Sequence, residues 1–465
     1  MLFSELQFWV FFAVVAALYA VLPHKGQNRM LLVASYAFYA AWDWRFLSLI
    51  LLSTVVDYLV GLKMHQATDD GRRRRLLWIS LGVNLGLLGV FKYFGFFVDS
   101  FAAMLAAIGY QADPFTLSII LPVGISFYTF QTLSYTIDIH RREMAPTRDF
   151  FDFALFVAFF PQLVAGPIER AKNLLPNIAA PRVIRAEDVG RGAVLCLLGL
   201  VKKIVIADGI APTVDAVFGA ESAAGVDVLL ATWLFAIQIY CDFSGYTDIA
   251  RGVAMMLGFR LMVNFAQPYF AYDPQSFWRR WHISLSSWLR DYLYVSMGGN
   301  RGGRVATYRN LMATMTLGGL WHGAAWNFVL WGLFQGALLA AHRALFGRAG
   351  GGLIWPLRVL AAAAFFQVVC YGWLLFRAQS FGQIEAFTAA LFSIDFAAAT
   401  LPSPPFAAFL GIAFLMVWDL LSEWLGPEFY RRAPILIRGG LYAGMIYLLA
   451  FGATTQTTAF IYFQF

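Results

Sequence analysis

The chain has 465 residues, of which 60% are hydrophobic and only 13% are charged, and its mean hydropathy is +0.65. A soluble domain carries about 25% charged residues, so this composition excludes a chain that folds around one core in water. The formal net charge of +7 comes largely from arginines in loops between apolar segments, which favours membrane orientation over nucleic-acid binding. We therefore predict a polytopic integral membrane protein that contacts membrane lipid and binds no nucleic acid.

Apolar runs recur along the whole chain. Those that approach the ~20 residues needed to cross a hydrocarbon core are 6–22, 46–62, 355–376 and 435–451. Shorter runs at 76–88, 228–239 and 406–421 span only with help from their flanks, or are re-entrant. The pattern predicts an all-α fold of about ten or eleven transmembrane or re-entrant helices, in a single integral membrane domain over residues 1–465.

Basic residues predict how the chain crosses the membrane, because short loops rich in Lys and Arg prefer the cytoplasm. The clusters are Lys25 with Arg29, Arg72 to Arg75, Arg141 and Arg142 with Arg148, Arg343 with Arg348, and Arg431 with Arg432. Placing all of them in the cytoplasm puts the loop at 99–113, which lacks Lys and Arg, on the other side. Both termini, and a C-terminal tail over 456–465, are then extracytoplasmic.

Prolines and a lysine pair interrupt the apolar pattern between about 115 and 320. Lys202 and Lys203 lie inside an apolar run, and Pro161, Pro212 and Pro268 break others. Irregular backbone is tolerated at membrane depth only where protein or a water-filled cavity covers it. We therefore expect the functional site in this region.

The densest polar segment covers residues 277–292. Read as one helix, it has an apolar stripe of Trp278, Trp281, Leu285, Trp288 and Tyr292, with Arg279, His282 and Ser286 on the adjacent polar face. An interfacial amphipathic helix with an aromatic belt is the alternative interpretation.

A second polar segment, 318–327, contains His322 beside Trp321 and leads through Asn327 into an apolar span. An ionisable residue there tends to face a cavity, and histidine is easily poised as a general base, although a structural histidine is the alternative. In a third cluster, Asp242 and Asp248 adjoin an apolar run. They are expected to orient a base or to bind Arg279 or Arg280, or else to cap a helix end.

The sequence lacks the residue patterns of disulfide-bonded proteins, zinc enzymes and serine hydrolases. Cys196, Cys241 and Cys370 are far apart and read as packing residues. There is no H-E-x-x-H zinc pattern and no G-x-S-x-G elbow. We expect no metal and no permanently bound cofactor, and no cofactor-binding residue can be named.

These motifs resemble the membrane-bound O-acyltransferase (MBOAT) family. The resemblance rests on Trp281-His282-Ile283-Ser284, Arg290-Asp291-Tyr292 and Leu320-Trp321-His322-Gly323, and it extends through Phe160-Pro161-Gln162-Leu163-Val164-Ala165-Gly166-Pro167-Ile168 to the final Phe460-Ile461-Tyr462-Phe463-Gln464-Phe465. Within the family the chain is most similar to the bacterial branch that serves alginate O-acetylation and teichoic-acid D-alanylation.

The resemblance implies a helical ring around a central tunnel in a multi-pass protein of the bacterial inner membrane. It implies transfer of an acetyl group, with acetyl-CoA as the expected donor, toward an exported polysaccharide such as alginate through a secreted SGNH-type acetyltransferase partner. His322 matches the signature histidine and His282 the second polar site, with Asp242, Arg279, Arg280, Ser286, Trp321 and Asn327 supporting them. D-alanyl transfer from a carrier protein to teichoic acid, and transport of a lipid-linked sugar, are the alternatives.

Tyr462 stands among the aromatic residues that end the chain. The resemblance implies that such a tyrosine accepts an acyl group, and a phenol of pKa about 10 suits a relay to a sugar or serine hydroxyl. An aromatic membrane anchor is the alternative.

Overall fold

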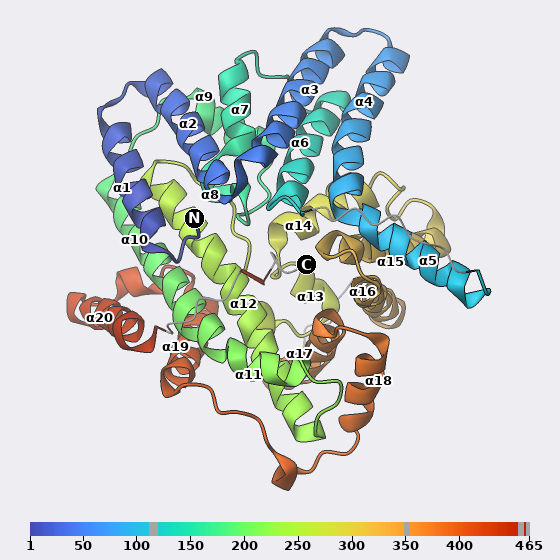
Figure 1. Ribbon diagram of the computed structural model, residues 1–465. Helices are drawn as coiled ribbons and strands as arrows, with labels where there is room; N and C mark the ends of the chain where they lie inside the picture. Colours follow the sequence, from blue (N-terminus) through green and yellow to red (C-terminus); the bar gives the residue numbers. More distant parts are fainter. Residues whose placement is uncertain (111–119, 348–353, 454–459, 462–465) are drawn as a thin grey trace. The chain divides into compact units, whose positions relative to one another are not determined.

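The computed structural model describes residues 1–110, 120–347, 354–453 and 460–461, and these ranges contain helices and connecting segments but no strand (Figure 1). The chain divides into two compact units. The first comprises Met1–Val189 with Val253–Met262, and the second comprises Gly190–Gly252 with Val263–Phe465. The single integral membrane domain over 1–465 stays a prediction.

The first unit consists of short and long helices in the N-terminal part of the chain. They are α1 (Leu6–Val21), α2 (His24–Asp43), η1 (Trp44–Phe46), α3 (Leu47–Gln66), α4 (Asp70–Leu88), η2 (Gly89–Tyr93), α5 (Phe94–Ala107), α6 (Ile125–His140), α7 (Phe150–Ala158), α8 (Phe160–Leu163) and α9 (Ala171–Ala179). Helices α3, α4 and α6 lie side by side (Figure 1). Between them Asp57 accepts hydrogen bonds from Ser80 at 2.6 Å and Asn84 at 2.9 Å, which satisfies polar groups that lipid would leave without partners.

The second unit carries the remaining helices, and the boundary between the units passes within α10 and α12. They are α10 (Ala186–Leu200), η3 (Val201–Ala207), α11 (Asp208–Phe218), α12 (Gly225–Met256), η4 (Pro268–Phe270), α13 (Pro274–Trp278), α14 (Ile283–Trp288), η5 (Leu289–Tyr294), α15 (Gly303–His322), α16 (Trp326–Phe346), α17 (Trp355–Arg377), α18 (Phe381–Ala390), η6 (Phe396–Ala398), α19 (Phe406–Leu425), η7 (Phe429–Arg432) and α20 (Ile435–Gly452).

Seven helical stretches in the described ranges are long and apolar enough to cross a membrane. They are His24–Gln66, Asp70–Ala107, Gly225–Met256, Trp326–Phe346, Trp355–Arg377, Phe406–Leu425 and Ile435–Gly452, and Leu6–Val21 is a shorter apolar helix. The predicted class, an all-α polytopic membrane protein, is confirmed. The number of crossings, the ring and the tunnel stay predictions.

The runs at 76–88, 228–239 and 406–421 were expected to span only with help from their flanks or to be re-entrant, and the first alternative fits: each lies within a candidate span that continues into its polar flanks. One expectation about these segments is wrong. Asp99 is not in a loop, since it belongs to α5. Apolar length alone underestimates such helices, because their ends carry polar residues without losing backbone hydrogen bonds.

Glycines allow close contact between the helices that carry the polar segments of the second unit. A Cβ atom on Gly319 of α15 would lie 2.2 Å from the carbonyl oxygen of Phe328 in α16. A Cβ atom on Gly199 of α10 would likewise lie 2.5 Å from the carbonyl oxygen of Gly245 in α12. Only residues without a side chain permit such close approach of backbones, so these contacts fix His322 at the end of α15 and place η3 against α12.

Candidate functional site

The segment 277–292 is not the single helix predicted from its periodicity. Helix α13 ends at Trp278 and α14 begins at Ile283, and between them His282 has a left-handed backbone with φ of +43°. The backbone of a neighbouring segment explains the break: the Ile283 N–H donates to the Asn264 carbonyl at 2.9 Å. As a result His282 is fully buried, instead of sharing a polar helix face with Arg279 and Ser286.

Asn264 determines which nitrogen of His282 carries the proton. The backbone N–H of Ser284 donates to Asn264 Oδ1 at 3.2 Å, and the Ser284 hydroxyl donates to the same oxygen at 2.9 Å. Because a backbone N–H only donates, the atom it meets must be the amide oxygen. His282 Nδ1 lies 3.1 Å from this oxygen and therefore donates to it. In the neutral ring Nε2 then carries the lone pair.

His322 lies beside His282 in an aromatic enclosure. The two imidazole centroids are 6.4 Å apart, and His322 is 4% exposed at the end of α15. Its ring is 5.1 Å from Trp331 and 5.5 Å from Phe376, and Trp321 packs 6.0 Å from His282. The structure thus brings together both predicted histidines and Trp321.

The enclosure also controls the charge of His282, which lies between α13 and α14 and outside the seven candidate spans. Burial, and to a lesser degree the neighbouring His322, hold the pKa of His282 well below its usual value. Removing water penalises the charged imidazolium. His282 is therefore neutral near pH 7, so that Nε2 is able to accept a hydrogen bond.

Asp242 lies in the middle of α12, so the helix-cap interpretation is wrong. It does not bind Arg279 or Arg280 either. Asp242 Oδ1 pairs with Lys203 Nζ at 2.7 Å, while Arg280 forms a two-pronged ion pair with Glu423 at 2.7 and 2.9 Å. The close backbone contact between α10 and α12 decides this pairing, since it places η3 against Asp242.

Among the other residues predicted to support the site, Ser286 and Asn327 make hydrogen bonds to backbone carbonyls, whereas Arg279 faces outward. Arg279 is exposed. The Ser286 hydroxyl donates to the Trp281 carbonyl at 3.0 Å, and the Asn327 amide donates to the carbonyls of Phe376 and Ala378 at 3.1 and 3.0 Å. Ser286 therefore supports the turn that carries His282, and Asn327 ties α16 to the end of α17.

Phe460 and Ile461, which lie near the end of the chain, are buried in the second unit. Phe460 is 1% and Ile461 is 4% exposed. The Phe460 ring lies 4.9 Å from Tyr246 and 5.8 Å from Phe243, and Phe243 meets the ring of His282 edge to face at 4.7 Å. Tyr462, predicted as an acyl carrier, lies outside the described residues, as does most of the predicted tail over 456–465.

Sequence reasoning missed Asn264 and Phe243, and it left Lys203 without a partner. The signal for Lys203 was its place in an apolar run, where a buried cation requires a carboxylate. Asn264 and Phe243 gave no comparable signal, because a single amide in a connecting segment and a phenylalanine in an apolar helix are ordinary.

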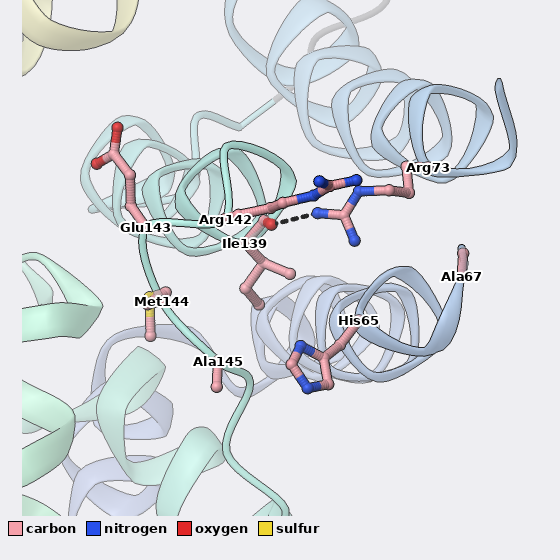
Figure 2. Close-up of a pocket in the computed structure, with 8 residues that line it drawn as sticks. All are labelled: His65, Ala67, Arg73, Ile139, Arg142, Glu143, Met144 and Ala145. Atoms are coloured by element: carbon pink, nitrogen blue, oxygen red, sulfur yellow. Dashed lines mark hydrogen bonds between the residues drawn. The ribbon is translucent and has the colours of Figure 1, made fainter. Parts of the chain in front are cut away.

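A cavity of about 490 Å³ lies in the first unit, and it contains none of the predicted site residues (Figure 2). Its lining is His65, Ala67, Arg73, Ile139, Arg142, Glu143, Met144 and Ala145. Arg73 is buried in the first turns of α4 rather than in a loop, and it donates to the carbonyls of Met64 and Ile139 at 2.6 and 2.7 Å. Arg142 pairs with Asp70 at 2.9 Å. Both arginines therefore already make hydrogen bonds within the protein, and Glu143 adds a negative charge to the lining.

Comparison with known proteins gives a consistent result. The sequence model of the MBOAT, membrane-bound O-acyltransferase family, matches residues 140–349. A probable alginate O-acetylase of Azotobacter vinelandii is 43% identical over 93% of this chain and 86% of its own length. A peptidoglycan O-acetyltransferase of Helicobacter pylori is 36% identical over 78% of this chain and 74% of its own length. A teichoic acid D-alanyltransferase of Streptococcus thermophilus is 24% identical over 72% and 76%.

Proposed function

This chain belongs to the membrane-bound O-acyltransferase family and is a multi-pass bacterial O-acyltransferase, and we propose that it moves an acetyl group across the inner membrane to acetylate an exported polysaccharide such as alginate. The donor in this proposal is cytoplasmic acetyl-CoA. Relatives that are 43% and 36% identical are named for alginate and peptidoglycan O-acetylation, which supports both the acetyl group and a polysaccharide acceptor.

The observation that carries the proposal is the enclosed histidine pair. Acyl transfer to a hydroxyl requires a base that removes the proton as the oxygen attacks. His282 and His322 are buried with their ring centroids 6.4 Å apart among aromatic rings, and burial restricts the access of water, which would otherwise compete as the acceptor. We assign His322 as the general base, and His282, held as its Nδ1–H tautomer by Asn264, as the group that orients or electrostatically supports the reacting atoms.

In the proposed first step, the Tyr462 hydroxyl attacks the thioester carbonyl of acetyl-CoA while His322 takes the phenolic proton. The C–S bond breaks, the thiolate of coenzyme A receives that proton, and acetyl-tyrosine remains. In the second step a hydroxyl of the acceptor attacks the tyrosine ester, and the phenol is restored with the acceptor's proton. The burial of Phe460 and Ile461, which directly precede Tyr462, supports this assignment over a membrane anchor.

The proposed topology follows from the basic segments. With the arginines of α4 in the cytoplasm, both termini are extracytoplasmic, and the acetyl group leaves the protein on that side. A secreted SGNH-type acetyltransferase is the proposed partner that carries it to the polymer. Only the small acyl group needs to cross, so the charged nucleotide remains in the cytoplasm.

D-alanyl transfer from a charged carrier protein is the second candidate, because a teichoic acid D-alanyltransferase is 24% identical over 72% of this chain. Purified protein in membrane vesicles, supplied with labelled acetyl-CoA or with D-alanyl carrier protein, separates the two. The proposal requires label from acetyl-CoA in the chain and then in a soluble acceptor. Label from the carrier protein alone would establish D-alanylation instead.

A further inference from the structure

The backbone of Ile461 is bound inside the second unit. The Ile461 N–H donates to Asp242 Oδ2 at 2.7 Å. This hydrogen bond is short and the acceptor is a carboxylate, so it belongs to the strong class of charge-assisted bonds. Because the donor is a backbone N–H, this hydrogen bond positions the chain without involving a side chain of the tail.

Lys203 holds the carboxylate that makes this bond. Its Nζ lies 2.7 Å from Asp242 Oδ1 and 2.8 Å from Asp208 Oδ1. The three side chains are nearly enclosed, with exposures of 8% for Lys203, 4% for Asp242 and 0% for Asp208. In such low-dielectric surroundings the ion pair is strengthened, whereas an unpaired charge is costly. The carboxylate therefore keeps one orientation, with Oδ1 toward Lys203 and Oδ2 toward Ile461.

The local structure of η3 contributes to this arrangement. Residues 201–207 form a π-helical turn between α10 and α11, a distortion that is frequent at functional sites. Asp242 is also connected to His282 through its neighbour in the chain. The next residue of α12, Phe243, packs against both His282 and Phe460.

We propose that Lys203 and Asp242 form a latch that positions the C-terminal tail beside the histidine pair. Asp242 is a positioning residue in this scheme, and it acts on the tail backbone rather than on the histidines. The consequence for catalysis rests on the proposed function of Tyr462, whereas the latch itself does not.

The test is digestion of the purified full-length protein in detergent by a carboxypeptidase, followed by the intact mass of the chain. In the wild type we expect trimming to stop before Phe460 and Ile461 are lost. In Asp242→Ala these residues should be removed about tenfold faster or more, since a hydrogen bond to a charged group stabilises by roughly that factor or more. Asp242→Asn should fall between the two, because it keeps an acceptor oxygen but loses the ion pair.

Two further variants keep the test decisive. Ile461→Pro removes the donor N–H without altering the helices. Because carboxypeptidases cleave poorly beside proline, this variant is compared with the wild type by limited digestion with chymotrypsin, which cuts after Tyr462; the cut should be faster in Ile461→Pro even if Asp242→Ala unfolds. Asp419→Ala removes a buried carboxylate that accepts a hydrogen bond from Tyr240 at 2.9 Å and should leave the tail protected. The latch is refuted if chymotrypsin cuts Ile461→Pro at the wild-type rate, or if Asp419→Ala exposes the tail as much as Asp242→Ala does.

Acetylation assays separate the latch from the proposed function. If trimming accelerates and acetylation falls in Asp242→Ala, both are supported. If trimming accelerates while Tyr462→Phe still acetylates polymer fully, the latch stands and the carrier role of Tyr462 fails.

Discussion

Asn264 Oδ1 accepts a hydrogen bond from His282 Nδ1 at 3.1 Å, and the Ser284 N–H at the same oxygen fixes the orientation of the amide. One asparagine thereby selects the tautomer of a fully buried histidine. Such an arrangement predicts that the amide influences catalysis through the pKa of His282 and not through the substrate.

Asn264→Asp should move the acidic limb of the pH–rate profile to higher pH. In the wild type the pKa of His282 is well below its usual value, so the neutral ring persists and activity is retained as the pH falls through about 6.5. A carboxylate next to Nδ1 favours the imidazolium and should raise this pKa by about 1 to 3 units. Single-turnover acetyl transfer measured from about pH 5 to about pH 9 checks this, and an unmoved limb would show that His282 does not control the rate.

His322→Ala should abolish acetylation, because removal of a general base costs about 10²- to 10⁴-fold in rate. Helix content by circular dichroism and the expression level should stay near wild type. His342→Ala is the matched control, since His342 is in α16 and packs against Phe346 rather than against His282. Wild-type turnover by the purified His322→Ala variant would refute the assignment of His322. For His282→Ala we expect a smaller or comparable loss.

Tyr462→Phe should abolish polymer acetylation while membrane insertion stays normal. The variant keeps an aromatic ring and deletes only the hydroxyl that would carry the acetyl group. Mass spectrometry of the wild type after incubation with acetyl-CoA should find an acetyl adduct on the C-terminal peptide, and the variant should lack it. Full acetylation of polymer by Tyr462→Phe would leave the tyrosine as an anchor only.

Gly319→Ala should lower both stability and turnover, because its Cβ atom would lie 2.2 Å from the carbonyl oxygen of Phe328. The helices must separate, and His322 at the end of α15 must move with them. Misplacement of a catalytic group by about 1 Å is able to cost about 10²-fold in rate. Gly444→Ala is the control, since a Cβ atom there meets nothing within 4 Å. Equal activity and thermal unfolding of the two variants would contradict this role for the helix contact.

Cysteine labelling in intact cells should find Arg74→Cys protected and a cysteine at Thr455 accessible to a membrane-impermeant maleimide. Arg74 is the suitable probe because its side chain is exposed, whereas Arg73 is buried. The expected result follows from the preference of basic segments for the cytoplasm. Reversed labelling would overturn the proposed direction of transfer.

The sequence by itself determined the membrane class, and it pointed to the residues of the candidate site. The composition and the length of the apolar runs required a membrane protein. The structure confirms helices at 6–21, 355–377 and 435–452. The residue types and motif spacing singled out His282 and His322, because a histidine in an apolar segment needs a functional or structural reason. The aromatic ending of the chain was equally visible in the sequence.

Only the tertiary structure decided how these residues meet. Periodicity placed His282 on a polar helix face, but hydrogen bonds from a segment 18 residues earlier broke that helix and buried the ring against Asn264. Asp242 forms an ion pair with Lys203 instead of with an arginine, because glycines bring α10 and α12 into backbone contact. Such pairings depend on contacts between segments far apart in the chain, and a local pattern carries no information about which partner a buried charge will find.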